Sequence, residues 1–260
     1  MITNAFDSDR SALLEPSNLD PSSVMIPETV VVTFQASTFA SLRHCFETTP
    51  VVKLGLGEAG PSGVEEVFTI SHRQRTIGVY LSSVGAPSAV GAFELAIAAG
   101  AKRFLFFGTC GTLIDDLAPN DLIVPTAAWR DEGTSYHYLP ASDEIAIPTA
   151  NRLSTMMAAR DLPHRLGKIW TTDAIFRETR RNTDLRRAAG CIAVDMEIAA
   201  LQAVTQFRGV EAYFFVYGAD ALGVDWDQRT LGRLDHDSRS ALATIAIDLG
   251  VDLMDDNRPS

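Results

Sequence analysis

From residue 29 onwards, short runs of apolar residues alternate with longer segments of helix-like composition. Runs such as 29–34 (TVVVTF) and 211–217 (EAYFFVY) are almost wholly apolar, instead of being apolar at every second position. Strands of this kind are buried on both faces, as in parallel sheets that helices cover on both sides. The alternation therefore predicts an α/β fold: a three-layer α-β-α sandwich around a twisted, mostly parallel but mixed sheet.

The expected elements follow one another without a linker. Pro87 stands in the first turn of an expected helix, where a missing N–H costs nothing, and Gly100 ends that helix. Residues 28–260 are therefore predicted to form one domain, preceded by an N-terminal arm at 1–27 that is rich in Ser, Pro, Asn and Asp. The further strands are expected at 64–70, 76–82, 103–107, 121–125, 168–172 and 191–194, and the helices at 88–99, 150–160, 197–206 and 234–253.

Charge and cysteine content narrow the classes of function. A formal net charge of −11 repels phosphate backbones and anionic lipids, so we expect neither a nucleic-acid partner nor a membrane partner. Cys45, Cys110 and Cys191 are far apart in the sequence, which argues against a disulfide framework or a zinc site and fits a reducing cytosol. The first ten residues lack the apolar run of a signal peptide, and we expect a cytoplasmic protein.

Polar or glycine-rich residues follow four of the apolar runs. They occupy 83–88, 108–111, 195–197 and 218–220, and we expect each of these segments to be a turn at the end of a strand. In open α/β sheets, ligands bind beyond the carboxyl ends of the strands. The four turns are therefore predicted to line one crevice.

Each of these features also has a purely structural interpretation. Gly108 and Gly111 can simply make a tight turn, and Glu197 can complement the dipole at a helix start. Asp220 can cap the next segment, and Met196 is more often a core residue than a ligand contact. It is the joint placement of the four turns that favours a binding site.

Together, the segments resemble the nucleoside phosphorylase family, which contains purine nucleoside phosphorylases, uridine phosphorylases and related nucleosidases. The resemblance spans residues 30 to about 250 and implies that residues 28–260 form a nucleoside phosphorylase-like catalytic domain. The matching segments occur in the order of the family: 84–88 (VGAPS), 104–111 (FLFFGTCG), 132–138 (EGTSYHY), 171–176 (TTDAIF), 194–200 (VDMEIAA) and Asp220.

The resemblance implies roles for the matching residues. Cleavage of an N-glycosidic bond develops positive charge on the ribose, which Glu197 would stabilise while binding the ribose hydroxyls. Asp220 would protonate a purine at its imidazole nitrogen, and it must keep its proton near neutral pH in apolar surroundings to do so. The other expected substrate-binding residues are Met196 against the sugar, Phe176 on the base or in the core, Gly85, Ser88 and Thr109 near the nucleophile, and also Asp195 and Gly108.

The nucleophile side departs from the family pattern. The Gly-Asp-Pro-x-Arg turn of phosphorylases is replaced by 34–38 (FQAST), and Phe106 stands where they carry an arginine. Arginine holds phosphate through two parallel charged hydrogen bonds, so its loss should weaken phosphate binding. The hydrolases of the family carry a glutamate after the first strand, where this chain has Gln35, which cannot act as a base. The arginines that could substitute are Arg73, Arg75, Arg130, Arg177, Arg180 and Arg181.

We therefore expect phosphorolysis of a purine nucleoside to the free base and ribose 1-phosphate. The alternatives are a nucleosidase that uses water and a nucleoside-binding member without turnover. Members that prefer pyrimidines do not usually carry Asp220, and Ala219 replaces the serine that often orients this acid. The arm offers no histidine to a neighbouring subunit. The resemblance implies no metal or organic cofactor, a small nucleoside and phosphate as partners, and a homo-oligomer.

Overall fold

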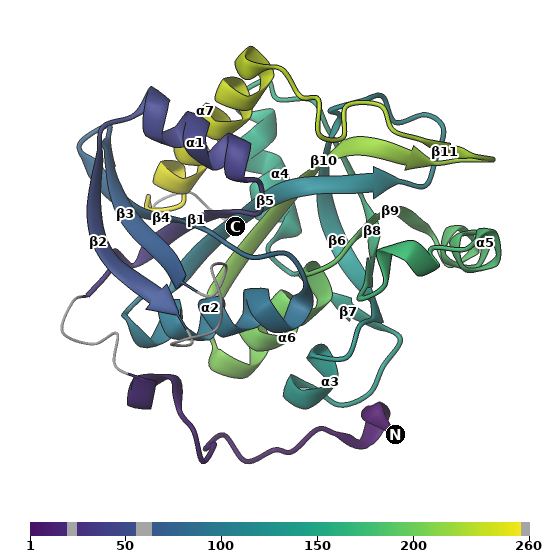
Figure 1. Cartoon of the computed structure of the whole chain (residues 1–260), viewed down its shortest axis with the longest axis horizontal. Coiled ribbons are helices and arrows are strands. Elements are labelled where there is room, and N and C mark those ends of the chain that lie inside the picture. Colours follow the sequence, from purple (N-terminus) through teal and green to yellow (C-terminus); the bar gives the residue numbers. More distant parts are fainter. Residues whose placement is uncertain (20–24, 56–63, 256–260) are drawn as a thin grey trace.

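The computed structural model describes residues 1–19, 25–55 and 64–255, and its strands form one mixed sheet with helices on both faces (Figure 1). β1 (Thr29–Thr33) lies between β4 (Arg75–Leu81) and β5 (Arg103–Thr112), parallel to both. β3 (Val64–His72) and β2 (Thr48–Gly55) extend the sheet beyond β4 as antiparallel strands. The predicted α/β architecture is confirmed.

The other half of the sheet closes on itself. β10 (Glu211–Leu222) pairs with β5 on one side and with β6 (Leu122–Asp131) on the other. β8 (His164–Thr172) and β9 (Cys191–Asp195) complete the ring from β6 back to β5. The short strands β7 (Glu144–Ala146) and β11 (Trp226–Asp227) are added to β6 and β10.

The helices form two layers, as Figure 1 shows. α2 (Ala86–Ala98) and α6 (Ile198–Arg208) pack together on one face, with α3 (Ser135–Tyr138) beside α6. The opposite layer consists of α1 (Ala36–Cys45), α4 (Ala150–Ala158) and α7 (His236–Asp252). α5 (Arg180–Ala188) lies apart from both layers, next to β9.

Apolar runs that the sequence marked as strands build the core. Val30, Val31 and Val32 of β1 are fully buried. On β5, the ring of Phe106 stacks on Phe104 and on Phe214 of β10, with centroid distances of 5.9 and 5.4 Å. Burial of one such side chain contributes about 1.5–3 kcal/mol, so these runs fix the strands between the helix layers.

Two of the four expected turns are wrong. Residues 108–111 continue β5 and residues 218–220 continue β10, instead of leaving the sheet. The reason is ring closure: Gly111 pairs with Val194 of β9 and with Asp220 of β10, so the backbone stays extended. A Cβ atom at Gly111 would lie 2.5 Å from Leu222 and 2.9 Å from Val194, which explains the glycine.

Some elements were not expected from the sequence, among them the helices α1, α3 and α5 and the strands β2, β7 and β11. In α5 the sequence RRNTDLRRA has no apolar stripe, and the helix is marked instead by the hydroxyl of Thr179, which accepts a hydrogen bond from the backbone N–H of Asn182 at 3.4 Å. The strands and helices that were expected are present, with ends that differ by a few residues in most cases.

The N-terminal residues run along the α2, α3 and α6 side of the molecule (Figure 1). They contain two short 3-10 helices, η1 (Ile2–Asn4) and η2 (Pro16–Leu19), and the Arg10 guanidinium lies 5.5 Å from the Phe207 ring centroid. Ile26 is already part of the core, and the division into an arm and a catalytic domain stays a prediction. In the described part of the chain, no helix combines the length and apolar character needed to cross a bilayer.

Candidate functional site

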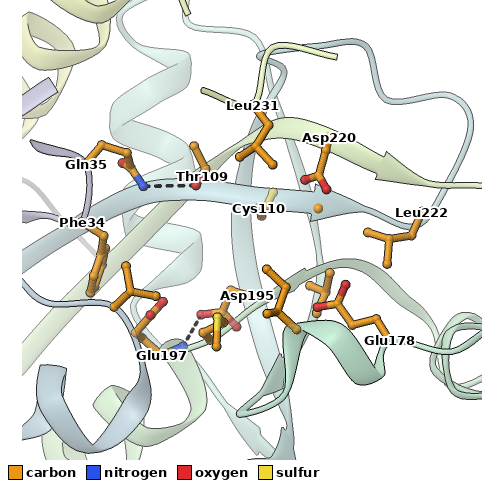
Figure 2. A pocket seen from close by; sticks show the side chains of 15 residues that line it. Phe34, Gln35, Thr109, Cys110, Glu178, Asp195, Glu197, Asp220, Leu222 and Leu231 are labelled. Carbon is orange, nitrogen blue, oxygen red and sulfur yellow. Dashed lines mark hydrogen bonds between the residues drawn. The ribbon is translucent and has the colours of Figure 1, made fainter. Parts of the chain in front are cut away.

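A cavity of about 150 Å³ lies where the ends of β5, β9 and β10 meet (Figure 2). All four segments that the sequence predicted to share a crevice contribute to it, through Val84, 109–111, 194–197 and Asp220. Four carboxyl side chains are among the lining residues, and none of the lining residues is Lys or Arg. The cavity is therefore acidic within the described residues.

Glu197 lies at one end of this cavity, immediately before α6 (Figure 2). It is 8% exposed, and its Oε1 atom accepts a hydrogen bond of 2.6 Å from the backbone N–H of Gly85. Gly85 has a φ of 99°, a conformation that favours glycine. Burial, and then the charge of Asp195, raise the pKa of Glu197. A cationic group beside Glu197 would favour its ionised form.

Asp195 is buried behind Glu197 and holds the start of α6. Its Oδ2 accepts from the backbone N–H groups of Glu197 (2.9 Å) and Ile198 (2.7 Å), which a helix start otherwise leaves unpaired. Its Oδ1 accepts from the Thr171 hydroxyl at 2.6 Å. Although Asp195 lines the cavity, both of its oxygens are engaged within the protein, so it is placed to position Glu197.

Asp220 lies at the opposite end of the cavity (Figure 2). The indole N–H of Trp226 donates a hydrogen bond of 2.7 Å to its Oδ2 atom. Burial raises the pKa of Asp220, while the bond from Trp226 acts in the opposite direction. This chain has Ala219 in place of the serine that often orients the acid, and Trp226, from the short strand β11, holds Asp220 instead. Nothing in the sequence indicated this role of Trp226.

Glu178 is a second residue that sequence reasoning missed. It directly follows the 3-10 helix η3 (Ile175–Arg177), and its carboxyl points into the cavity towards Asp220 (Figure 2). Burial, and then the charge of Asp220, raise the pKa of Glu178 to about 7. Its position could have indicated it from the sequence, because Glu178 stands two residues beyond the segment 171–176 that resembles a base site.

Uncharged side chains form the end of the cavity next to β1. The Gln35 Nε2 atom donates to the Thr109 hydroxyl at 3.1 Å, and the Tyr217 hydroxyl donates to Gln35 Oε1 at 3.4 Å. The rings of Phe34 and Phe106 stack beside them with centroids 6.5 Å apart. Residues 56–63 lie outside the described part, and their sequence contains neither Lys nor Arg.

Four expected substrate-binding residues do not line this cavity. Gly85 is one of them, and it acts only through its hydrogen bond to Glu197. Phe176 is 96% exposed, because the tight turn of η3 directs Ile175 inwards and the next side chain outwards; it neither faces the cavity nor fills the core. Ser88 is exposed on α2. Gly108 instead lines a small cavity of about 10 Å³, together with Phe106 and Phe214.

The arginines considered as substitutes for phosphate ligands do not line the cavity either. Arg73 pairs with Asp248 at 2.7 Å, and Arg75 pairs with Asp255 at 3.0 Å. Arg130 is buried and donates hydrogen bonds to Ser135, Ser142 and two carbonyl oxygens. Arg177 and Arg181 are exposed. Arg180 lines a second cavity. The described residues also contain no group of three or more His, Cys, Asp and Glu that could hold a metal ion.

Comparison with known families gives a match over most of the chain. The family model described as "Phosphorylase superfamily" matches residues 29–248. A guanosine phosphorylase of Halorubrum lacusprofundi is 29% identical over 150 residues, and a DeoD-type purine nucleoside phosphorylase of Myxococcus xanthus is 31% identical over 150 residues. Each match covers 56% of this chain, and this chain spans 62% of the length of each relative.

Solved structures share the fold at low sequence identity. A uridine phosphorylase from Vibrio fischeri has a TM-score of 0.72 at 18% identity, over 94% of this chain and 99% of that one. A futalosine hydrolase mutant from Helicobacter pylori has a TM-score of 0.66 at 19% identity, over 86% of this chain and 98% of that one. The fold thus occurs both in a phosphorylase and in a hydrolase.

Proposed function

Because this chain belongs to the phosphorylase superfamily, we propose that it cleaves the N-glycosidic bond of a purine nucleoside. One observation carries the proposal: Glu197 and Asp220 lie at opposite ends of a single cavity, with Met196 among the residues that line it. Departure of the base leaves positive charge on the ribose and negative charge on the base. The carboxylate of Glu197 would stabilise the positive charge on the ribose, and the protonated carboxyl of Asp220 would neutralise the negative charge on the base.

At the ribose end, Glu197 accepts hydrogen bonds from the sugar hydroxyls. The Gly85 N–H fixes its Oε1 atom, and Asp195 fixes its backbone through the start of α6. Such fixed orientation lowers the cost of reorganisation during bond cleavage. Met196 packs against the sugar, and the cation that develops there favours the ionised form of Glu197.

At the base end, Asp220 donates a proton to the imidazole nitrogen of the purine. The Trp226 N–H occupies Oδ2, so Oδ1 is the atom that carries the proton to the base. A raised pKa supports this role, because the carboxyl must stay protonated until the base departs. The purine assignment rests on this acid and on the names of the relatives, a guanosine phosphorylase and a purine nucleoside phosphorylase.

Those names favour phosphate as the acceptor, which would give ribose 1-phosphate, with phosphate at the Gln35 and Thr109 end of the cavity. A second candidate, hydrolysis, is favoured by the uncharged wall of that end. A phosphate dianion beside several carboxyl groups, with no Lys or Arg in the described lining, would be repelled and poorly compensated for lost hydration. Water meets no such cost, and the Gln35 amide and the Thr109 hydroxyl can hold it by hydrogen bonds.

The test is base release from inosine, guanosine, adenosine and uridine by phosphate-free protein, with and without added phosphate. Purine release that requires phosphate supports phosphorolysis, and release that is indifferent to phosphate supports hydrolysis. Glu197→Ala should abolish either activity. Uridine cleavage as fast as purine cleavage would contradict the purine assignment. Nucleoside binding without release would favour the non-catalytic alternative.

A further inference from the structure

A second cavity, of about 220 Å³, adjoins the base end of the first and shares Glu178 and Leu222 with it. One wall is α5, through Arg180, Thr183 and Arg187, and the other is the turn at 222–226 that leads from β10 to β11. Figure 1 shows α5 and the β10–β11 hairpin at the same end of the molecule. The two cavities are therefore neighbours that meet at Glu178 and Leu222.

Hydrogen bonds from Arg187 hold the walls of the second cavity in place. Its guanidinium donates to the backbone oxygens of Leu113 and Leu222 and, at 3.0 Å, to the Asp184 carboxylate. These bonds tie α5 to the segments that follow β5 and end β10. They use each of the three nitrogens of Arg187 once, so this arginine mainly shapes the cavity.

Arg180, in contrast, keeps unused polar groups. The Arg180 Nη2 atom donates to the Val224 backbone oxygen at 2.5 Å, whereas its Nε and Nη1 atoms make no hydrogen bond within the described residues. Thr183 also lines the cavity. Its hydroxyl can donate a hydrogen bond to an acceptor group of a ligand bound there.

Charge is divided between the two cavities. The first is lined by four carboxyls and, among described residues, by no cation. The second contains both arginines, together with Glu178 and Asp225, whose side chain is 94% exposed. A negatively charged group on a ligand would therefore find a cation beyond Glu178 and not at the ribose end.

We infer that the second cavity binds an acidic substituent carried by the six-membered ring of the purine. The inference rests on the proposed function, since it places the base between Asp220 and Glu178. With the imidazole nitrogen at Asp220, the six-membered ring is the part of the purine farthest from the ribose. A carboxylate on an N6 side chain then reaches the free N–H groups of Arg180 and the hydroxyl of Thr183. The substrate class is purine nucleosides with an anionic N6 substituent.

The test compares three nucleosides: adenosine, N6-carboxymethyladenosine and its uncharged amide, N6-carbamoylmethyladenosine. The last two have nearly the same shape and differ in charge. We expect the wild-type kcat/KM for the acid to exceed that for the amide about 2- to 5-fold, because the Arg180 side chain is 64% exposed and solvent screens its charge. Arg180→Ala should remove this preference while leaving adenosine cleavage unchanged, and Thr183→Val should reduce it. Arg181→Ala is the matched control, because Arg181 is an exposed arginine of α5 outside the cavity.

Binding of the same compounds, measured by calorimetry, separates this inference from the proposed function. If adenosine is cleaved but acid and amide behave alike, the second cavity does not recognise the charge and the inference is wrong. If nothing is cleaved but the acid binds more tightly than the amide in an Arg180-dependent way, the inference holds and the proposed function fails. Equal effects of Arg180→Ala and Arg181→Ala, or no binding of either compound, overturn the inference.

Discussion

The Asp220 carboxyl shows how a single side chain acquires a chemical role from its neighbours. It ends up half-buried because β10 continues past the position where the sequence indicated a turn. Burial raises its pKa, and Trp226 fixes one of its two oxygens. An aspartate at the same place in an exposed turn would lose its proton well below neutral pH.

Replacement of Asp220 tests the proton transfer directly. Asp220→Asn should lower purine nucleoside cleavage by about 100- to 10,000-fold, the usual range for loss of a general acid. Cleavage of a riboside whose leaving group needs no proton, such as a nitrophenyl riboside, should fall far less. The measurement is kcat/KM for both substrates, and equal losses would contradict the acid role.

Trp226→Phe tests how the hydrogen bond from Trp226 sets the pKa of Asp220, and the direction of the expected change follows from that bond. The bond from Trp226 stabilises the ionised form of Asp220, so its loss should raise the pKa of Asp220 further. Because the protonated form is the active one, activity falls as pH rises through this pKa. The alkaline limb of the pH–rate profile should therefore move to higher pH in the variant, and a limb that stays in place or moves down would count against the assignment.

At the scale of elements, ring closure around β5 decides where the site lies. Gly111 lies between Val194 and Asp220, so one residue joins the strand before Glu197 to the strand that carries the acid. A side chain at this position has no room. We expect Gly111→Ala to lower the free energy of unfolding by about 1–3 kcal/mol, the usual cost of overpacking.

Urea unfolding of this variant provides the measurement. Gly133→Ala is a suitable control, because a Cβ atom there would meet its nearest neighbour, the Asp173 carboxylate, at 3.8 Å, an ordinary contact distance. A midpoint for Gly111→Ala equal to that of the control would mean that the strands separate easily at this point, contrary to the tight pairing in the structure.

The same elements show what could be predicted from the sequence. The buried strands were found because continuous apolar runs such as Val30–Val32 are typical of strands that are covered on both faces. The closure of the sheet was not found, because it depends on pairings between strands far apart in sequence. Glu197 and Asp220 were placed by resemblance at ends of strands. Glu178 follows a single-turn helix and Trp226 lies in a two-residue strand, and elements this short have no periodicity that a sequence could show.

At the scale of the whole molecule, an ionic cluster joins two distant parts of the chain. Asp248 of α7 accepts from His72 at 2.8 Å and from Arg73 at 2.7 Å, both at the turn between β3 and β4. Arg160, which follows α4, lies 3.3 Å from the same carboxylate and 2.6 Å from Asp252. The cluster thus links the edge of the sheet to the closing helix.

We expect Asp248→Ala to destabilise the protein by about 1–2 kcal/mol, more than an isolated surface pair would, because three partners lose one partly buried acceptor. Thermal unfolding at low and high salt is the measurement, and the difference from wild type should shrink as salt screens the cluster. Asp115→Ala, at an exposed position, is the control. A shift no larger than that of the control would show that this cluster contributes little to stability.

The pairing of Gly111 with strands on both sides has a consequence for selectivity. Glu197, the proposed sugar-binding carboxylate, follows a strand that pairs with Gly111, and Asp220, the proposed proton donor, lies on a strand that pairs with the same residue. The sheet therefore sets the separation of the two backbone segments, and the Gly85 N–H holds the Glu197 carboxylate in place. The two carboxyl groups therefore favour substrates with one particular distance between ribose and base. Nucleosides that differ in size are then accepted or rejected by the surrounding side chains, above all those of η3 and of the turn before β11.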